Sequence, residues 1–174
     1  PWRTGYFGNG LIKTNASETS STIVGRLCFV GTESAPKTTF QVADGTAADD
    51  LIVSAAIYDH SGFEGKMTLV KEGPGTMVLS GSNTYGGATN ITAGTLKLEG
   101  DAAIPDGPGK GNVVLNGGAT AAGTLDLNGS NETINGLSGT SGTVLGRVVN
   151  NKSGTTAKLT VGAGDATASF AGIL

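Results

Sequence analysis

One short unit recurs along this chain and limits what the chain can fold into. Each copy begins near a glycine, carries two aliphatic residues separated by one position, and closes with a glycine. The copies are residues 75–81 (GTMVLSG), 94–100 (GTLKLEG), 111–117 (GNVVLNG) and 123–129 (GTLDLNG), with a looser copy at residues 157–162 (AKLTVG). The alternation predicts short β-strands with one buried face. Because a nearly identical strand returns at intervals of 19, 17 and 12 residues, the repeat predicts a coil of stacked rungs rather than a sandwich.

Strand patterns continue through most of the remaining sequence. Runs of alternating or apolar residues, bounded by Gly, Asn, Asp or Ser, include residues 21–30 (STIVGRLCFV), 38–43 (TTFQVA), 49–59 (DDLIVSAAIYD) and 168–174 (ASFAGIL). No segment places apolar residues at the i, i+3, i+4 and i+7 positions of an amphipathic helix. The chain is therefore predicted to be all-β.

A parallel β-helix accounts for this composition. In such a coil each rung hydrogen-bonds to the rungs above and below, about 4.8 Å away. Aliphatic side chains stack inside, while Thr, Lys, Glu and Asn alternate outward. The corners need positive φ angles, which glycine adopts freely, and the chain has 30 glycines. At roughly 20 residues per rung, the chain is predicted to form a single domain of about eight or nine rungs.

Charge and composition exclude several classes of protein. The formal net charge is −3, and the eleven Lys and Arg residues are scattered singly, which argues against a nucleic-acid partner. No stretch approaches the ~18 consecutive apolar residues of a membrane helix, so no membrane insertion is expected. The one cysteine, Cys28, lies in an apolar run and is expected to be a buried residue rather than a reactive thiol.

One stretch resembles a known family. Residues 68–98 (TLVKEGPGTMVLSGSNTYGGATNITAGTLKL) resemble the autotransporter-associated β-strand repeat of secreted bacterial passenger proteins. The matching positions are Lys71, Gly73, Pro74, Gly75, Thr76, Leu79, Ser80, Gly81, Asn83, Thr84, Tyr85, Gly87, Thr89, Ala93, Gly94, Thr95 and Leu96. Residues 123–174 resemble the segment that follows such a repeat, and residues 49–57 resemble the segment that precedes it. No family resemblance is identified for residues 1–48.

The resemblance implies a right-handed parallel β-helix located outside the cell or on the bacterial cell surface. The repeat of that family is structural, so it carries over no catalytic, cofactor-binding or metal-binding residue. Within one solenoid domain, residues 49–174 are expected to hold the repeats and to end openly at the C-terminus. Residues 1–48 are expected to form an atypical, capping N-terminal part. The expected function is that of a non-catalytic stalk or fibre subunit.

The residues that could support catalysis are few. His60 is the only histidine, and its neighbours Asp59 and Ser61 would point to the opposite face of an extended segment, so they cannot form a relay. Stacked rungs could bring carboxylates to the separations that glycosidases use. The available pairs are Asp49 with Asp50, Asp59 with Glu64, and Asp101 with Asp106. Aromatic residues, which line many sugar-binding clefts, make up 5% of the chain. A carbohydrate-binding or carbohydrate-cleaving β-helix is the alternative function.

A metal site has one weak candidate. Residues 162–167 (GAGDAT) resemble the calcium-binding nonapeptide of β-rolls, but the motif occurs once, whereas such sites need the repeating aspartate. Neither a metal nor a cofactor is expected.

The two ends of a solenoid expose unpaired strand edges, which promote association. Near the N-terminus, Trp2, Tyr6 and Phe7 are expected to cover the core. At the C-terminus, residues 167–174 (TASFAGIL) stay apolar to the last position, and Phe170, Ile173 and Leu174 are the expected contacts. Three explanations compete for this end: a longer passenger chain continues it, a partner domain covers it, or an identical chain stacks on it head to tail and builds a polymer.

Overall fold

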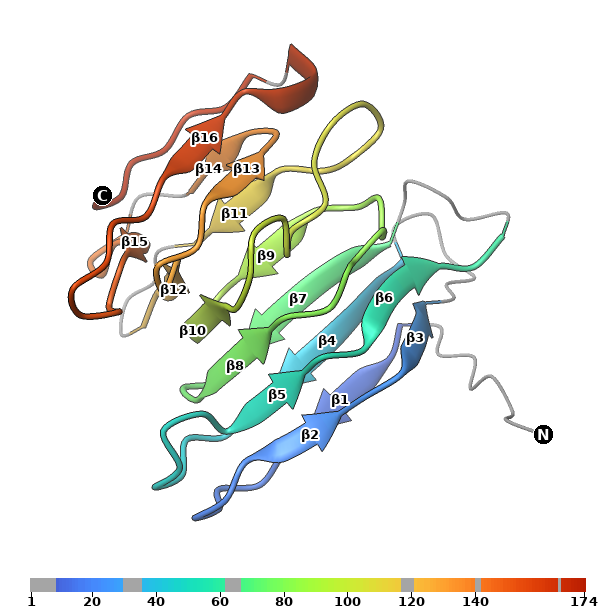
Figure 1. Ribbon diagram of the computed structural model, residues 1–174, viewed down its shortest axis with the longest axis vertical. Helices are drawn as coiled ribbons and strands as arrows, with labels where there is room; N and C mark the ends of the chain where they lie inside the picture. The colour runs from blue at the N-terminus through green and yellow to red at the C-terminus, as the bar shows by residue number, and fades with distance from the viewer. Residues whose placement is uncertain (1–8, 30–35, 62–66, 117–120, 140–141, 166) are drawn as a thin grey trace.

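The computed structural model describes residues 9–29, 36–61, 67–116, 121–139, 142–165 and 167–174. Within these ranges the chain is an all-β parallel solenoid of about five turns, as Figure 1 shows. The described residues contain no α-helix, and one short 3₁₀ turn, η1 (Ala163–Asp165), lies near the C-terminal end. The expected all-β parallel β-helix is therefore confirmed, but the expected eight or nine rungs are wrong.

Two six-stranded parallel sheets form two faces of the coil. In the first, called sheet 1, the strands follow in the order β1 (Leu11–Lys13), β4 (Lys37–Gln41), β7 (Thr68–Glu72), β9 (Thr89–Ile91), β11 (Val113–Leu115) and β14 (Leu137–Ser138). In sheet 2 the order is β2 (Ser21–Ile23), β5 (Leu51–Val53), β8 (Thr76–Leu79), β10 (Gly94–Leu98), β12 (Gly123–Asp126) and β15 (Arg147–Val149).

A third face is only partly strand. Near the N-terminal end β3 (Arg26–Phe29) pairs with β6 (Ala56–Asp59), and near the C-terminal end β13 (Glu132–Ile134) pairs with β16 (Leu159–Val161). The two turns between these pairs place no strand on the third face. Figure 1 shows the strands following one another along the rod, with β1–β3 at one end and β14–β16 at the other.

The rung count was wrong because a turn of this coil is longer than the repeat suggests. Sheet 1 aligns Leu11, Thr39, Val70, Asn90, Val114 and Ser138 in one column. The steps along this column are therefore 28, 31, 20, 24 and 24 residues. Loops at the corners lengthen most turns. In addition, each turn of the coil carries two or three strands rather than one.

The repeated units do not all occupy the same face. The units at residues 75–81, 94–100 and 123–129 form β8, β10 and β12, which stack directly in sheet 2. The unit at residues 111–117 forms β11 of sheet 1, and the looser copy at 157–162 forms β16 of the third face. The same alternating strand therefore serves all three faces, and spacing alone does not separate neighbours in a stack from neighbours around one turn.

The core is a stack of aliphatic side chains from successive turns. In sheet 2 Leu51, Met77, Leu96 and Leu125 are register partners, and each is essentially fully buried. Fully burying one such side chain contributes about 1.5–3 kcal/mol. The alternation inferred from the sequence thus produces the observed core, because residues i and i+2 of a strand face the same side.

Glycines allow neighbouring turns to approach closely at the corners. Gly94 has a φ of +65°, and a β-carbon there would collide with the carbonyl oxygens of Gly73, Pro74 and Gly75 in the preceding turn. Gly81 has no positive φ, yet a β-carbon would collide with the Ala55 carbonyl. Glycine at these corners is therefore required by packing as well as by backbone conformation.

Candidate functional site

The last segment of the chain extends the coil by pairing with the turn that precedes it. Gly139 and Phe170 are paired in a parallel bridge, as are Arg147 and Ile173. The Ile173 N–H donates to the Gly146 carbonyl at 3.0 Å, and the Val148 N–H donates to the Ile173 carbonyl at 2.9 Å. Residues 169–173 therefore begin a further layer of sheet at the C-terminal end of the rod.

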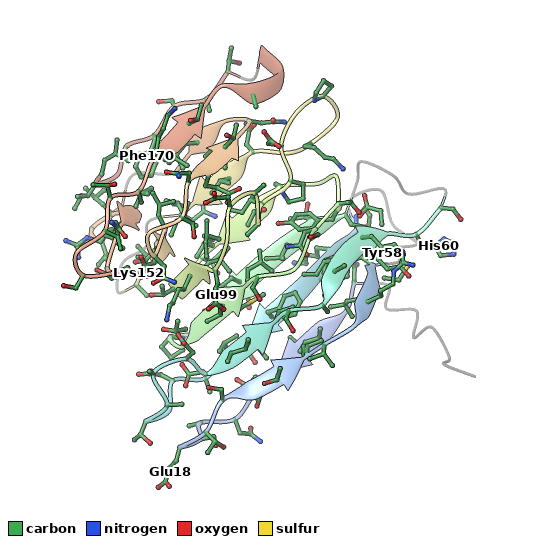
Figure 2. The ribbon with its side chains drawn as sticks, in the orientation of Figure 1. Glu18, Tyr58, His60, Glu99, Lys152 and Phe170 are labelled. Carbon is green, nitrogen blue, oxygen red and sulfur yellow. The ribbon has the colours of Figure 1, made fainter. Side chains whose placement is uncertain are left out.

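The three C-terminal residues expected to form contacts fall into two kinds. The Phe170 ring is half-buried, packs against the core, and lies over Gly139 and Gly172; Figure 2 labels it beside the final strands. Ile173 and Leu174 are 44% and 84% exposed. Phe170 therefore covers the end of the core, while Ile173 and Leu174 present apolar surface to the outside together with Val161.

The N-terminal candidates Trp2, Tyr6 and Phe7 lie outside the described residues. The first described turn nevertheless exposes apolar side chains, because Leu11 of β1 is 60% exposed and Val24, just after β2, is 72% exposed. Both described ends of the rod thus combine a terminal parallel strand with exposed aliphatic groups.

Three of the acidic residues considered for catalysis accept hydrogen bonds from backbone N–H groups. Asp50 accepts from Gly45 at 2.7 Å and from Thr76 at 2.8 Å. Asp59 accepts from the N–H of Gly86 at 2.9 Å. The Asp101 carboxylate accepts from the N–H of Asn131 at 2.7 Å. These carboxylates fasten one turn or corner to another, and Glu64 lies outside the described residues.

His60 follows the last residue of β6, and its backbone N–H donates to the Phe29 carbonyl at 2.9 Å. Figure 2 shows Tyr58 and His60 near each other at the end of this strand. The Arg26 guanidinium lies over the Tyr58 ring, 4.5 Å from the ring centre. At this distance a cation is attracted to the ring face. His60 therefore lies at a structural corner of the third face.

Two shallow polar cavities that share Asn128 lie on the outer side of sheet 2 and at the corner that follows it. One, of about 230 Å³, includes Lys97 and Asp126, and the other, of about 290 Å³, includes Glu99 and Lys152. Lys97 binds both carboxylate oxygens of Asp49 at 2.9 and 3.1 Å. Neither cavity is lined by an aromatic side chain, so the stacking platform of many sugar sites is missing from these described surfaces.

The burial of two charged residues was not predicted from the sequence. Lys71 is fully buried and occupies an inward column of sheet 1 between Phe40 and Ile91. Burial lowers the pKa of Lys71 to about 8, although the charges of Asp50 and Glu72 act to raise it. The alternation of inward and outward side chains along a strand could have predicted this burial, because Lys71 lies two positions after the inward Leu69.

The second buried charge is Glu132, which lies two positions before the buried Ile134 of β13. Burial raises the pKa of the Glu132 carboxyl to about 7, against hydrogen bonds from Ile104 and Ala103 that lower it. The short run NETI was not recognised as a strand, because its flanking residues have the composition of a turn. The strands β1 and β14 were missed for the same reason.

The described part of the chain offers no metal centre of three or more His, Cys, Asp or Glu side chains. Residues 163–165 of the calcium-like motif form η1. Across the same described ranges, no helix has the length and apolar character needed to cross a membrane.

Comparisons with known proteins point to one family. The model of the passenger-associated-transport-repeat matches residues 69–98. The adhesin BmaC autotransporter of Brucella suis biovar 1 (strain 1330) is 34% identical over 116 residues, which cover 66% of this chain. The match spans 3% of the length of that adhesin. No solved structure matches the chain.

Proposed function

Because this chain belongs to the autotransporter passenger repeat family, we propose that it is a length of rod in a protein displayed on, or released from, a bacterial surface. Its role is structural: it extends or polymerises, and it does not catalyse a reaction. We also propose that the coil is right-handed, as connections between parallel strands of one sheet are in nearly all proteins.

The exposed C-terminal end of the coil is the observation that carries this proposal. There the side chains of Val161, Ile173 and Leu174 are 49%, 44% and 84% exposed. They lie on the last described layer of a parallel stack. A terminal parallel strand offers unpaired N–H and C=O groups, so this surface suits another turn of the same kind of coil.

In a solution of the isolated chain, the complementary surface is the first turn of a second copy. That turn also ends in parallel strands, β1 to β3, and it exposes Leu11 and Val24. Contact between unlike ends does not close on itself and therefore builds a filament. In a longer passenger chain, a preceding or following turn would occupy the same surfaces.

Negative-stain electron microscopy of the chain over a hundredfold concentration range tests the assembly. We expect rods that lengthen with concentration and show a regular axial repeat. Leu174→Lys places a charge in the joint and should shorten the rods, as should removal of residues 167–174. Glu99→Lys introduces the same side chain at an exposed position on the fourth turn, away from both ends, and should not. Uniform short rods at every concentration would contradict polymerisation by this chain alone.

A carbohydrate-binding role is the second candidate, favoured by the two polar cavities on sheet 2. Lys97, Asp126 and Asn128 offer the hydrogen-bonding groups that a polyhydroxylated ligand needs. A glycan array incubated with the labelled chain separates the two roles. A structural rod should bind none of the glycans, whereas saturable binding that Lys97→Ala abolishes would favour the carbohydrate role.

A further inference from the structure

The third face of the solenoid is interrupted for two turns, and side chains bridge the interruption. On the N-terminal side, the Ile57 N–H of β6 donates to Asn83 Oδ1 at 2.9 Å, and Asn83 Nδ2 donates to the Ala103 carbonyl at 2.7 Å. On the C-terminal side, Glu132 of β13 bonds the same segment. Polar side chains thus replace the strand ladder between β6 and β13.

The Glu132 carboxylate is the link to the C-terminal turns. Its Oε2 accepts from the Ala103 N–H at 3.0 Å and its Oε1 accepts from the Ile104 N–H at 3.1 Å. The Glu132 N–H in turn donates to the Lys158 carbonyl at 2.9 Å. One buried carboxyl group therefore joins the segment around Ala103 to β13.

That segment is held in a strained conformation. Ala102 has a φ of 61°, in the left-handed region that is unfavourable for a residue with a β-carbon. Gly100 and Gly107, at its two ends, have φ angles of 101° and 90°. Between them, Ala103 and Ile104 are buried in the core at 3% and 2% exposure. The bonds to Glu132 and the burial of these two residues oppose a local tendency to open.

The surroundings of Glu132 supply no compensating positive charge. Among the described residues, both donors to its carboxylate are neutral backbone amides. Asp106 and Asp101, on the bridging segment, and Tyr85, on the preceding turn, are the titratable groups that act on it. The Lys158 carbonyl faces its backbone N–H, and the Lys158 residue is exposed. An ionised Glu132 is therefore buried against neutral donors and acidic neighbours.

We propose that Glu132 is a pH-sensitive latch that fastens residues 100–107 to the third face of the solenoid. With its carboxyl protonated, the segment stays closed over the core. When the carboxyl ionises, the segment opens more often and exposes Ala103 and Ile104. The latch is a property of this chain's fold and does not depend on whether the rods polymerise.

The direction of the pH effect follows from the two states of the carboxyl. In the closed segment its pKa is about 7, and in an opened, solvated segment it returns to about 4.5. Opening therefore releases a proton between these values, and the opening constant rises by up to about eightfold per pH unit as pH increases. Above pH 7 the group is ionised in both states and the constant levels off.

Amide hydrogen exchange of the full chain tests the latch at pH 5, 6, 7 and 8. After correction for the intrinsic exchange rate, the Ala103 and Ile104 amides should open about fortyfold more often at pH 7 than at pH 5. The increase from pH 7 to 8 should be small. The Val113 amide, which donates to the Gly136 carbonyl within the coil, serves as an internal control without this pH term.

Glu132→Gln keeps the shape of the side chain and removes its titration. The variant should abolish the extra pH dependence at Ala103 and Ile104 while leaving Val113 unchanged. Equal pH dependence in both proteins would overturn the proposal. If the variant does not fold, carbon-13 titration of the Glu132 carboxyl in the wild-type chain decides: a pKa above about 6 supports the latch, and a lower one overturns it.

Discussion

The ammonium group of Lys71 donates a 3.1 Å hydrogen bond to the carbonyl oxygen of Ala93, which lies one turn later in the coil. It also donates to the carbonyls of Glu72 and Gly73 at 3.1 and 2.9 Å. An ammonium has three donors, and all three are used at this corner. The buried lysine thus joins consecutive turns where the backbone leaves sheet 1.

Replacing this lysine by a residue of similar length should destabilise the coil. Lys71→Met fills the same space but leaves three partly buried carbonyl groups without their donor, and we expect a loss of about 2–4 kcal/mol. Urea unfolding followed by circular dichroism measures the change. Lys152→Met removes an exposed lysine and should alter stability by less than about 0.5 kcal/mol. A Lys71→Met protein as stable as the wild type would contradict this role.

The lowered pKa of Lys71 predicts a stability change at alkaline pH. Below pH 8 the group is protonated in both folded and unfolded chains, so it does not make the free energy of unfolding depend on pH. Between about pH 8 and 10.5 the unfolded chain binds more protons, and stability from this group rises with pH. Relative to Lys71→Met, the wild type should gain at most about 1.4 kcal/mol per pH unit in this window. Urea midpoints at pH 7.5, 8.5 and 9.5 measure it, and a constant difference would refute it.

Two glycines of positive φ should respond differently to alanine. Gly94→Ala adds backbone strain and a collision with the carbonyls of Gly73, Pro74 and Gly75, so we expect a loss of about 3 kcal/mol or more. Gly100 has a φ of +101° but nothing within 4 Å of its β-carbon position. Gly100→Ala should cost only the strain, about 1–2 kcal/mol. Thermal unfolding of both variants makes the comparison, and equal losses would show that close packing at Gly94 is unimportant.

The half-buried and the exposed residues of the C-terminal end should also differ in their contribution to the stability of the single chain. Phe170→Ala uncovers the end of the core and should destabilise the single chain by about 2 kcal/mol, less than for a fully buried phenylalanine. Leu174→Ala, at an 84% exposed position, should leave unfolding of the single chain within about 0.5 kcal/mol. Chemical denaturation at low protein concentration isolates these effects from assembly. The ranking is wrong if Leu174→Ala costs as much as Phe170→Ala.

The family resemblance and the parallel all-β coil were both readable from residues 68–98. Leu96 and its partners Met77 and Leu125 face the core as the alternation of their units predicts. The sequence predicted the location of the C-terminal candidate residues but not the role of each one. Phe170, Ile173 and Leu174 all lie at the end of the rod, but Phe170 packs against the core and so differs in role from the other two.

What the sequence determined by itself is local: short strands with one apolar face, joined at corners by glycine and asparagine. The tertiary structure decided which strands stack. GNVVLNG and GTLDLNG follow the same pattern, yet the first lies in sheet 1 and the second in sheet 2, because the length of each turn depends on where its loops close. It also decided the roles of Lys71 and Glu132. A charged residue in an alternating strand is tolerated inside only where carbonyl or N–H groups satisfy it. The Ala93 carbonyl that binds Lys71 and the two amides that bind Glu132 come from residues distant in the chain.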